Sequence, residues 1–143
     1  MPDPNPSALA FLQTRRSRPA KTLTTPVPGS DELRGLIKGA ARVPDHGKLE
    51  PWRFLVLEKP ALERLAETIP EKGQELSITP EKIEKAVQEY KTADLAIVVI
   101  SSPKPSENEP EIEQTLSAGA VSLLLVHAAL AAGWGANWMT GRA

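Results

Sequence analysis

The chain has 143 residues and a formal net charge of -1 at pH 7, and 41% of its residues are hydrophobic. A chain of this length can bury about two-thirds of the surface that it exposes when unfolded, so one domain can be stable without disulfides or structural metals. The balanced charge argues against a dedicated binder of nucleic acids or of anionic membranes.

The composition also limits the kind of site that the chain can hold. It contains no cysteine, which excludes disulfides and thiolate metal ligands. Residues 1–6 lack the basic and then apolar pattern of a secretory signal. We therefore expect a soluble, cytoplasmic protein.

A short helix is predicted over residues 7–14, capped by Ser7, with Leu9 and Leu12 facing the interior. It leads directly into a basic run, which consists of Arg15, Arg16, Ser17 and Arg18. Arginines at a helix end can simply complement the helix dipole, and composition alone favours this interpretation. They can also clamp an anion, because guanidinium groups match phosphate oxygens and Ser17 adds a hydroxyl donor.

The clearest amphipathic pattern begins at Ser30, which can cap a second helix. Its apolar positions follow the helical period and are Leu33, Leu36, Ile37, Ala40 and Ala41. The helix must end before Pro44, and residues 53–58 then have the pattern of a buried strand. A polar segment over 42–52 joins the two elements, and such loops on rigid elements often carry function.

His46 is the most unusual residue of this polar segment. The simplest interpretation is a surface histidine bonded to the adjacent Asp45. A His/Asp pair can also belong to a metal site or a nucleophilic triad. We set both aside, because no second histidine lies nearby and no serine has the nucleophile-elbow pattern.

Two further helices are predicted from Pro60 and Pro80, since proline is favoured in the first helical turn. Residues 70–79 are expected to form a polar connection between them. The continuous apolar run over 95–100 has the length of a strand buried on both faces. Residues 101–110, rich in Pro, Ser and Glu, are expected to form a loop.

The longest apolar stretch lies over residues 111–133 and predicts a helix that is apolar on all sides. Such a helix needs protein or lipid around it. Lipid is disfavoured, because the uninterrupted run is shorter than the ~20 residues of a membrane span and lacks flanking Lys/Arg clusters. Gly119 destabilises the helix interior by about 1 kcal/mol relative to alanine. Its presence suggests that another backbone approaches the helix closely at this position. We predict a central core helix that also contributes to a dimer interface.

Three motifs, in this order, resemble those of the nitroreductase family over essentially the whole chain: Arg15-Arg16-Ser17, then Arg42-Val43-Pro44-Asp45-His46 with Glu50-Pro51-Trp52, then Gly133-Trp134-Gly135 after the long apolar helix. The likeness is closest to the short, compact bacterial subgroup. It implies an α+β fold, with a mixed sheet flanked by helices around the central helix, in a homodimer. It also implies an FMN-dependent oxidoreductase that passes hydride from NAD(P)H to a nitroaromatic or quinone acceptor.

The resemblance further implies which residues hold the cofactor. Arg15, Arg16 and Ser17 would hold phosphate and ribityl oxygens of FMN, with Arg42 at the same cofactor. His46 would reach the FMN of the partner subunit. Flavin contacts would come from the segment after a short strand, at Trp138, Met139 and Thr140. No metal and no separate catalytic residue are expected, because flavin carries out hydride transfer itself. Segments 70–80 and 101–110 would be candidates for active-site lids.

Residues 1–143 are predicted to form a single nitroreductase-like domain that lacks the carboxyl-terminal elements of the family pattern. These elements include a helix, a strand and a basic residue for the FMN phosphate, so about three strands are expected, from Arg53, Leu95 and Trp134. The chain would then be a fragment or a degenerate copy. One alternative is a flavin-binding scaffold dimer without turnover. Another is a phosphate- or nucleic-acid-binding module, which the balanced charge disfavours.

Overall fold

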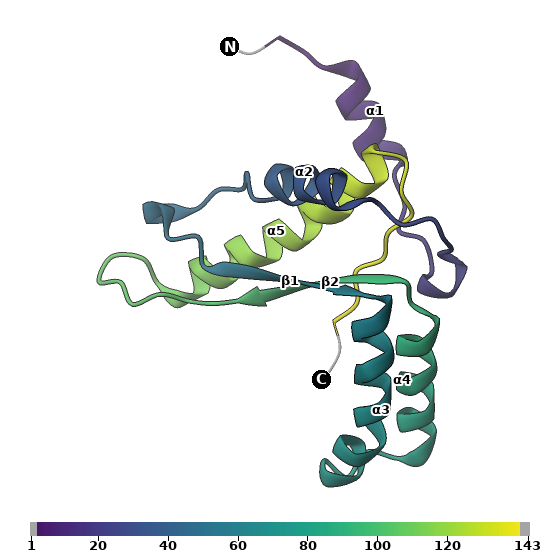
Figure 1. Cartoon of the computed structure of the whole chain (residues 1–143). Helices are drawn as coiled ribbons and strands as arrows, with labels where there is room; N and C mark the ends of the chain where they lie inside the picture. The colour runs from purple at the N-terminus through teal and green to yellow at the C-terminus, as the bar shows by residue number, and fades with distance from the viewer. Residues whose placement is uncertain (1–2, 141–143) are drawn as a thin grey trace.

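A computed structural model describes residues 3–140, and Figure 1 shows their arrangement. The helices and strands are, in order, α1 (Pro6–Thr14), α2 (Ser30–Ala40), β1 (Trp52–Glu58), α3 (Lys59–Glu75), α4 (Pro80–Thr92), β2 (Leu95–Ser101) and α5 (Glu111–Ala131). Two 3-10 turns lie in the connections before α2 and β1 and are η1 (Ala20–Thr22) and η2 (His46–Lys48). The predicted α+β class is confirmed.

Among the described residues, β1 and β2 form one antiparallel two-stranded sheet, in which Leu55 pairs with Val98. Both of these side chains are exposed, so the prediction of fully buried strands is wrong. The third strand expected near Trp134 is also wrong, which leaves no parallel neighbour for a mixed sheet within residues 3–140. The reason lies in the hydrogen bonds of that segment, since Trp134 N donates to Ala129 O (2.9 Å) and Ala136 O accepts from Arg18 N (3.0 Å).

The long helix α5 packs against α2 and β2 and lies between α2 and the sheet in Figure 1. One face of it supplies much of the core, through Gln114, Ala118, Val121, Leu125 and Val126. The prediction of a core helix is therefore confirmed for this face. The opposite face is open in the single chain, where Ile112, Leu116 and Leu123 are 64%, 66% and 42% exposed.

By length and composition alone, α5 could cross a membrane. Its contacts argue for a different role, because one side of it is covered by α2 and β2. It also buries the polar side chain of Gln114 within the protein. We therefore interpret α5 as the core helix of a water-soluble fold.

The first helix differs in detail from its prediction. Asn5 caps α1, accepting a hydrogen bond from Ala8 N (3.0 Å), and Ser7 lies inside the helix. Leu9 and Leu12 are 57% and 54% exposed, so their predicted inward orientation is wrong. The packed side of α1 carries Phe11 instead, because its ring contacts α5.

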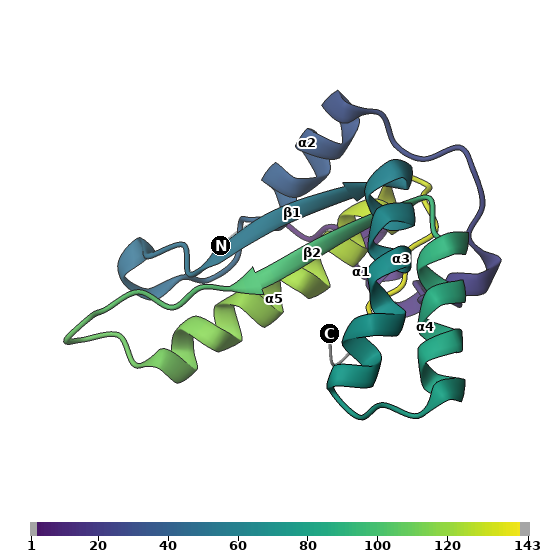
Figure 2. The same ribbon diagram turned by 60° about the horizontal axis from the view of Figure 1, so that its bottom comes forward.

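The helices α3 and α4 form a hairpin that projects from one end of the sheet (Figures 1 and 2). The predicted connection over 70–79 is wrong for its first half, because α3 continues through Pro70 to Glu75. Packing against α4 offsets the lost backbone hydrogen bond. Gly73 permits this packing, since a Cβ atom there would lie 2.5 Å from Ile83 Cγ1. The first half of the 70–80 lid candidate is thus part of a packed helix.

The loop between β2 and α5 is anchored by Gln114, a side chain that is only 4% exposed. Its Nε2 donates to Lys104 O (2.9 Å) and to Glu109 O (3.2 Å), and its Oε1 accepts from Lys104 N (2.8 Å). Both polar atoms of the amide are therefore paired. This side chain holds the 101–110 lid candidate against α5.

We expect Gln114→Ala to lower the free energy of unfolding by about 1–3 kcal/mol, because the part-buried backbone groups of Lys104 and Glu109 lose their hydrogen-bond partners. Urea denaturation at a fixed protein concentration measures this change. Gln88→Ala, at an exposed position of α4, is the matched control and should change stability by less than about 0.5 kcal/mol. Equal effects of the two substitutions would show that Gln114 does not anchor the loop.

Candidate functional site

The first cluster of predicted site residues lies near the carboxyl-terminal end of α5. Phe11 packs edge-on against His127, with ring centroids 5.9 Å apart, and this contact fixes the end of α1 on α5. Arg15 follows α1 directly and lies beside His127. Burial and the neighbouring Arg15 guanidinium lower the pKa of His127 from its usual value. The Nε atom of Arg15 is buried and has no hydrogen-bond partner among the described residues.

The chain after α5 returns to this cluster. Arg18 N donates to Ala136 O (3.0 Å), and Asn137 Nδ2 donates to Arg18 O (2.7 Å). These two bonds join Ala136 and Asn137, in the segment after α5, to Arg18. The three residues predicted to contact flavin (Trp138, Met139 and Thr140) thus follow a segment tied to the arginine run, and their side chains are exposed.

Within the arginine run, Arg16 is folded back over the end of α1. Its Nη1 donates to Arg15 O (2.9 Å) and to Gln13 O (3.4 Å). Arg16 and Ser17 are both exposed, so their polar groups are accessible to a ligand. Asn137 was missed by the sequence analysis, because an isolated asparagine between two tryptophans gives no motif.

The second cluster lies at the amino-terminal end of α5 and centres on His46. Its Nδ1 lies 2.9 Å from Glu113 Oε2, in the first turn of α5. Asp45 does not bond to it as predicted, because Asp45 Oδ2 accepts from Glu50 N (2.8 Å). Glu113 could not be singled out from the sequence, since carboxylates at a helix start are usually explained by the dipole alone. A second anchor joins the same segment to α5, where Ser117 Oγ donates to Pro44 O (2.9 Å).

The backbone of this second cluster follows an unusual path that brings it close to the loop before α5. Gly47, Lys48 and Glu50 have positive φ angles of 71°, 52° and 47°. A Cβ atom at Gly47 would lie 2.8 Å from Glu109 Oε1, so the absence of a side chain there permits the close approach. The hydrogen bond to Glu113 raises the pKa of His46, and Glu109 adds a smaller effect in the same direction.

The two clusters are well separated in one chain. Glu113 and His127, which mark them, are 14 residues apart on α5, and this spacing corresponds to about 21 Å along the helix. Arg15 and His46 of one chain therefore cannot both contact a single phosphate group. Arg42 follows the end of α2 and lies four residues before His46, so it belongs to the same connecting segment as the second cluster.

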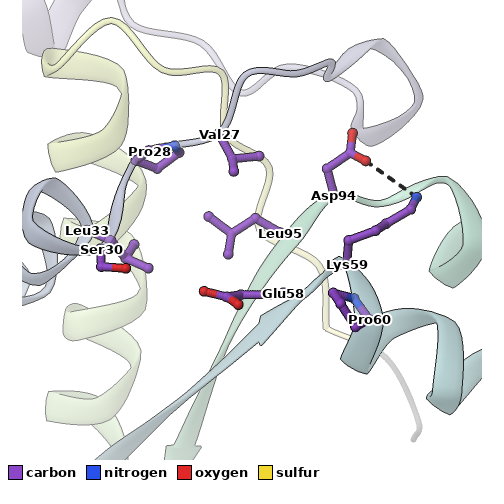
Figure 3. Close-up of a pocket in the computed structure, with 9 residues that line it drawn as sticks. All are labelled: Val27, Pro28, Ser30, Leu33, Glu58, Lys59, Pro60, Asp94 and Leu95. Atoms are coloured by element: carbon purple, nitrogen blue, oxygen red, sulfur yellow. Dashed lines mark ion pairs between the residues drawn. The ribbon is translucent and has the colours of Figure 1, made fainter.

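A separate groove of about 260 Å³ lies at the end of the sheet near the start of α3 (Figure 3). Its walls include the apolar side chains of Val27, Leu33 and Leu95 and an ion pair between Lys59 and Asp94 (3.4 Å). None of the eight predicted site residues lines it. Among residues 3–140, no group of three or more His, Asp or Glu side chains is placed to hold a metal ion.

Solved structures share this arrangement of elements. A nitroreductase-like family protein from Bacillus cereus has a TM-score of 0.76 and 22% identity, covering 99% of this chain and 73% of its own. A BluB-like flavoprotein from Clostridium difficile 630 has a TM-score of 0.68 and 18% identity, and the match covers 93% of this chain and 74% of the flavoprotein. The fold therefore defines an α+β protein of the nitroreductase-like class.

Sequence comparison is more specific than the fold. Residues 12–143 match the sequence model of a protein family that is described as "Nitroreductase family". A Haemophilus influenzae protein named "Putative NAD(P)H nitroreductase" is 36% identical over 136 residues, which are 94% of this chain and 73% of the relative. The Escherichia coli K12 protein "Putative NAD(P)H nitroreductase YdjA" is 31% identical over 134 residues, which are 94% of this chain and 72% of the relative. The chain belongs to the nitroreductase family, and the predicted resemblance is confirmed.

The chain has two histidines, and the usual pKa of a histidine is about 6.5. We expect the pKa of His46 to lie above this value and the pKa of His127 to lie below it. His46 gains a carboxylate partner, so the stability from this pair is complete below 6.5 and is lost as the pH rises through the raised native pKa. His127 is partly desolvated, so stability falls as the pH drops from 6.5 through its lowered native pKa.

An NMR titration of the imidazole resonances measures both pKa values, and His46→Gln assigns them. This substitution should remove the signal with the higher pKa. Two signals on the same side of 6.5, or loss of the lower one in the variant, would contradict the geometry of the two clusters.

Proposed function

We propose that the chain is an FMN-dependent oxidoreductase that takes hydride from NAD(P)H and passes electrons to a nitroaromatic or quinone-type acceptor. Family membership supports a flavin-dependent NAD(P)H oxidoreductase in general terms. FMN, the kind of acceptor and the homodimer are our proposal. The observation that carries it is the pair of hydrogen bonds that join Arg18 to Ala136 and Asn137, together with the buried Nε of Arg15, which has no partner among the described residues.

The arginine run fits the phosphate of FMN. A buried donor without a partner costs about 1–3 kcal/mol, and a phosphate oxygen at Arg15 Nε would remove that cost. Arg16 and Ser17 are accessible and add a second guanidinium group and a hydroxyl donor. These three residues would therefore bind the phosphate end of the cofactor.

The segment after α5 fits the flavin ring. Trp138 and Met139 offer exposed apolar surface, and Thr140 adds a hydroxyl group. When bound, FMN supplies the hydride-accepting ring, while the chain binds, orients and shields it. This division of labour explains why the chain needs no separate nucleophile or metal centre.

A second copy of the chain is needed to complete the site. The open face of α5 carries Ile112, Leu116, Gly119 and Leu123, at spacings of four, three and four residues. Such spacing is typical of a helix seam that packs on another helix. Apart from its chain neighbours and the nearby backbone of α5, no atom of residues 3–140 lies within 4 Å of a Cβ atom built at Gly119, so a partner backbone has room to approach.

Antiparallel pairing along this face would join the separated clusters. A two-fold axis across α5 puts the carboxyl-terminal end of one copy beside the amino-terminal end of the other. Arg15 of one chain would then share a cofactor with Arg42 and His46 of its partner. We propose this arrangement for residues 1–143 as one domain of a cytoplasmic homodimer.

We expect Leu116→Glu to dissociate the dimer, because it places a charge on the open face of α5, where burial of a leucine contributes about 1.5–3 kcal/mol. Sedimentation velocity over a range of protein concentrations measures the change. Leu76→Glu is the matched control, since Leu76 is similarly exposed but lies at the end of α3. A monomeric wild-type protein, or equal dissociation of both variants, would exclude this interface.

We expect Arg16→Ala to weaken FMN binding by about 10- to 100-fold, the usual effect of losing one charge-assisted hydrogen bond to phosphate. Fluorescence titration of the apoprotein with FMN measures the affinity. Arg34→Ala, at an exposed position of α2, is the control and should bind FMN as the wild type does. Equal affinities of wild type and Arg16→Ala would remove Arg16 from the site.

Catalysis requires a separate assay, which is oxidation of NADPH or NADH by the FMN-loaded protein with a nitroaromatic acceptor. Turnover supports the oxidoreductase. Tight FMN binding without oxidation of either nucleotide would instead support the scaffold alternative.

A further inference from the structure

We propose that Glu113 is a positioning residue that holds the His46 ring with Nδ1 toward α5 and Nε2 toward the cofactor bound by the partner copy. The inference rests on the proposed function, which brings His46 to the partner's FMN. It adds a role for a carboxylate that belongs to neither the arginine run nor the flavin-contacting segment.

The contact between Glu113 and His46 is direct, with 2.9 Å between Oε2 and Nδ1. Glu113 stands in the first turn of a 21-residue helix, where its backbone N–H donates to Pro110 O (3.0 Å). Ser117, one helical turn further along, bonds to Pro44 O from the same face of α5. The segment that carries His46 is thus bonded to α5 at two adjacent points. One bond is to the backbone carbonyl of Pro44 and the other is to the imidazole ring of His46.

Within residues 3–140, no other charged group offers His46 an equivalent contact. Asp45 is engaged by the backbone of Glu50. Glu109 lies 3.9 Å from Nε2, beyond hydrogen-bond distance, and its other oxygen accepts from the Ser106 hydroxyl. Lys48, on the same turn as His46, carries the opposite charge to these carboxylates. Of the charged groups that the structure describes, the Glu113 carboxylate alone lies within hydrogen-bond distance of the ring and can fix its orientation.

The consequence for the ring follows from its hydrogen-bonding chemistry. With Nδ1 bonded to a carboxylate, the proton of the neutral ring stays on Nδ1. The charged ring adds an N–H donor at Nε2, and the same carboxylate favours that charged state. His46 would therefore present a positively charged donor to the cofactor. This charge would attract the anionic phosphate or the reduced ring of FMN.

The first arm of the test uses the apoprotein and needs no cofactor. The His46 resonance is titrated in wild type, Glu113→Gln and Glu111→Gln, the last of which removes an equal charge from the same helical turn. We expect Glu113→Gln to move the pKa of His46 down toward its usual value and Glu111→Gln to leave it nearly unchanged. Equal shifts in the two variants, or none in Glu113→Gln, would overturn the proposal.

The second arm measures FMN affinity between pH 6 and pH 9. Wild type should lose affinity as the pH rises through the pKa of His46. Glu113→Gln should show this loss at lower pH, and His46→Gln should not show it. Adding Glu113→Gln to His46→Gln should change FMN affinity by less than about twofold. A further large loss in the double variant would mean that Glu113 acts independently of His46 and would overturn the proposal.

Two outcomes keep this test separate from that of the proposed function. Failure of wild type to bind FMN defeats the proposed function, and the positioning role with it. Normal FMN binding with identical pH profiles in wild type and Glu113→Gln defeats the positioning role alone. If Glu113→Gln does not fold, Glu113→Asp replaces it, because this change keeps the charge but withdraws the carboxylate by one methylene. It should also lower the pKa of His46, and an unchanged value would again be contradictory.

Discussion

The two faces of α5 determine how the molecule is built. One face buries Val121, Leu125 and their neighbours against α2 and β2, and it provides much of the core of the chain. The other face exposes Ile112, Leu116 and Leu123 to solvent. Leaving such side chains in water forgoes about 1.5–3 kcal/mol each. We propose that a second copy of α5 covers this face, because two identical apolar faces related by a two-fold axis are self-complementary.

The position of the candidate site follows from the length of this helix. α1 and the segment after α5 place Arg15 near one end, while η2 and the 44–46 segment place His46 near the other. A single chain cannot bring these groups to one phosphate, whereas the antiparallel pair that we propose would do so. The same pairing that would cover the apolar face would thus assemble the proposed FMN site, so stability and cofactor binding would depend on one interface.

Much of the fold could be predicted from the sequence, because the helices from Ser30 and Pro80 carry clear apolar periods and the core helix is a long uninterrupted run. The errors arose where tertiary contacts override local signals. Pro70 lies inside α3 because that helix packs against α4, and the segment from Trp134 bonds to Arg18 and α5 rather than to a strand. In the site, the arginine run and His46 were visible as motifs. Glu113 was not, since its partner is 67 residues away in the sequence.

The central claim is that each cofactor site combines the arginine run of one chain with His46 of the other, and mixed dimers test it most directly. Arg15→Ala/Arg16→Ala chains and Arg42→Ala/His46→Ala chains are co-expressed with different tags, and the mixed dimer is isolated by tandem purification. Each parental homodimer should bind FMN poorly. The mixed dimer is predicted to regain wild-type FMN affinity at half of its sites, because one site then contains only wild-type residues. A mixed dimer that binds FMN no better than its parents would contradict the account.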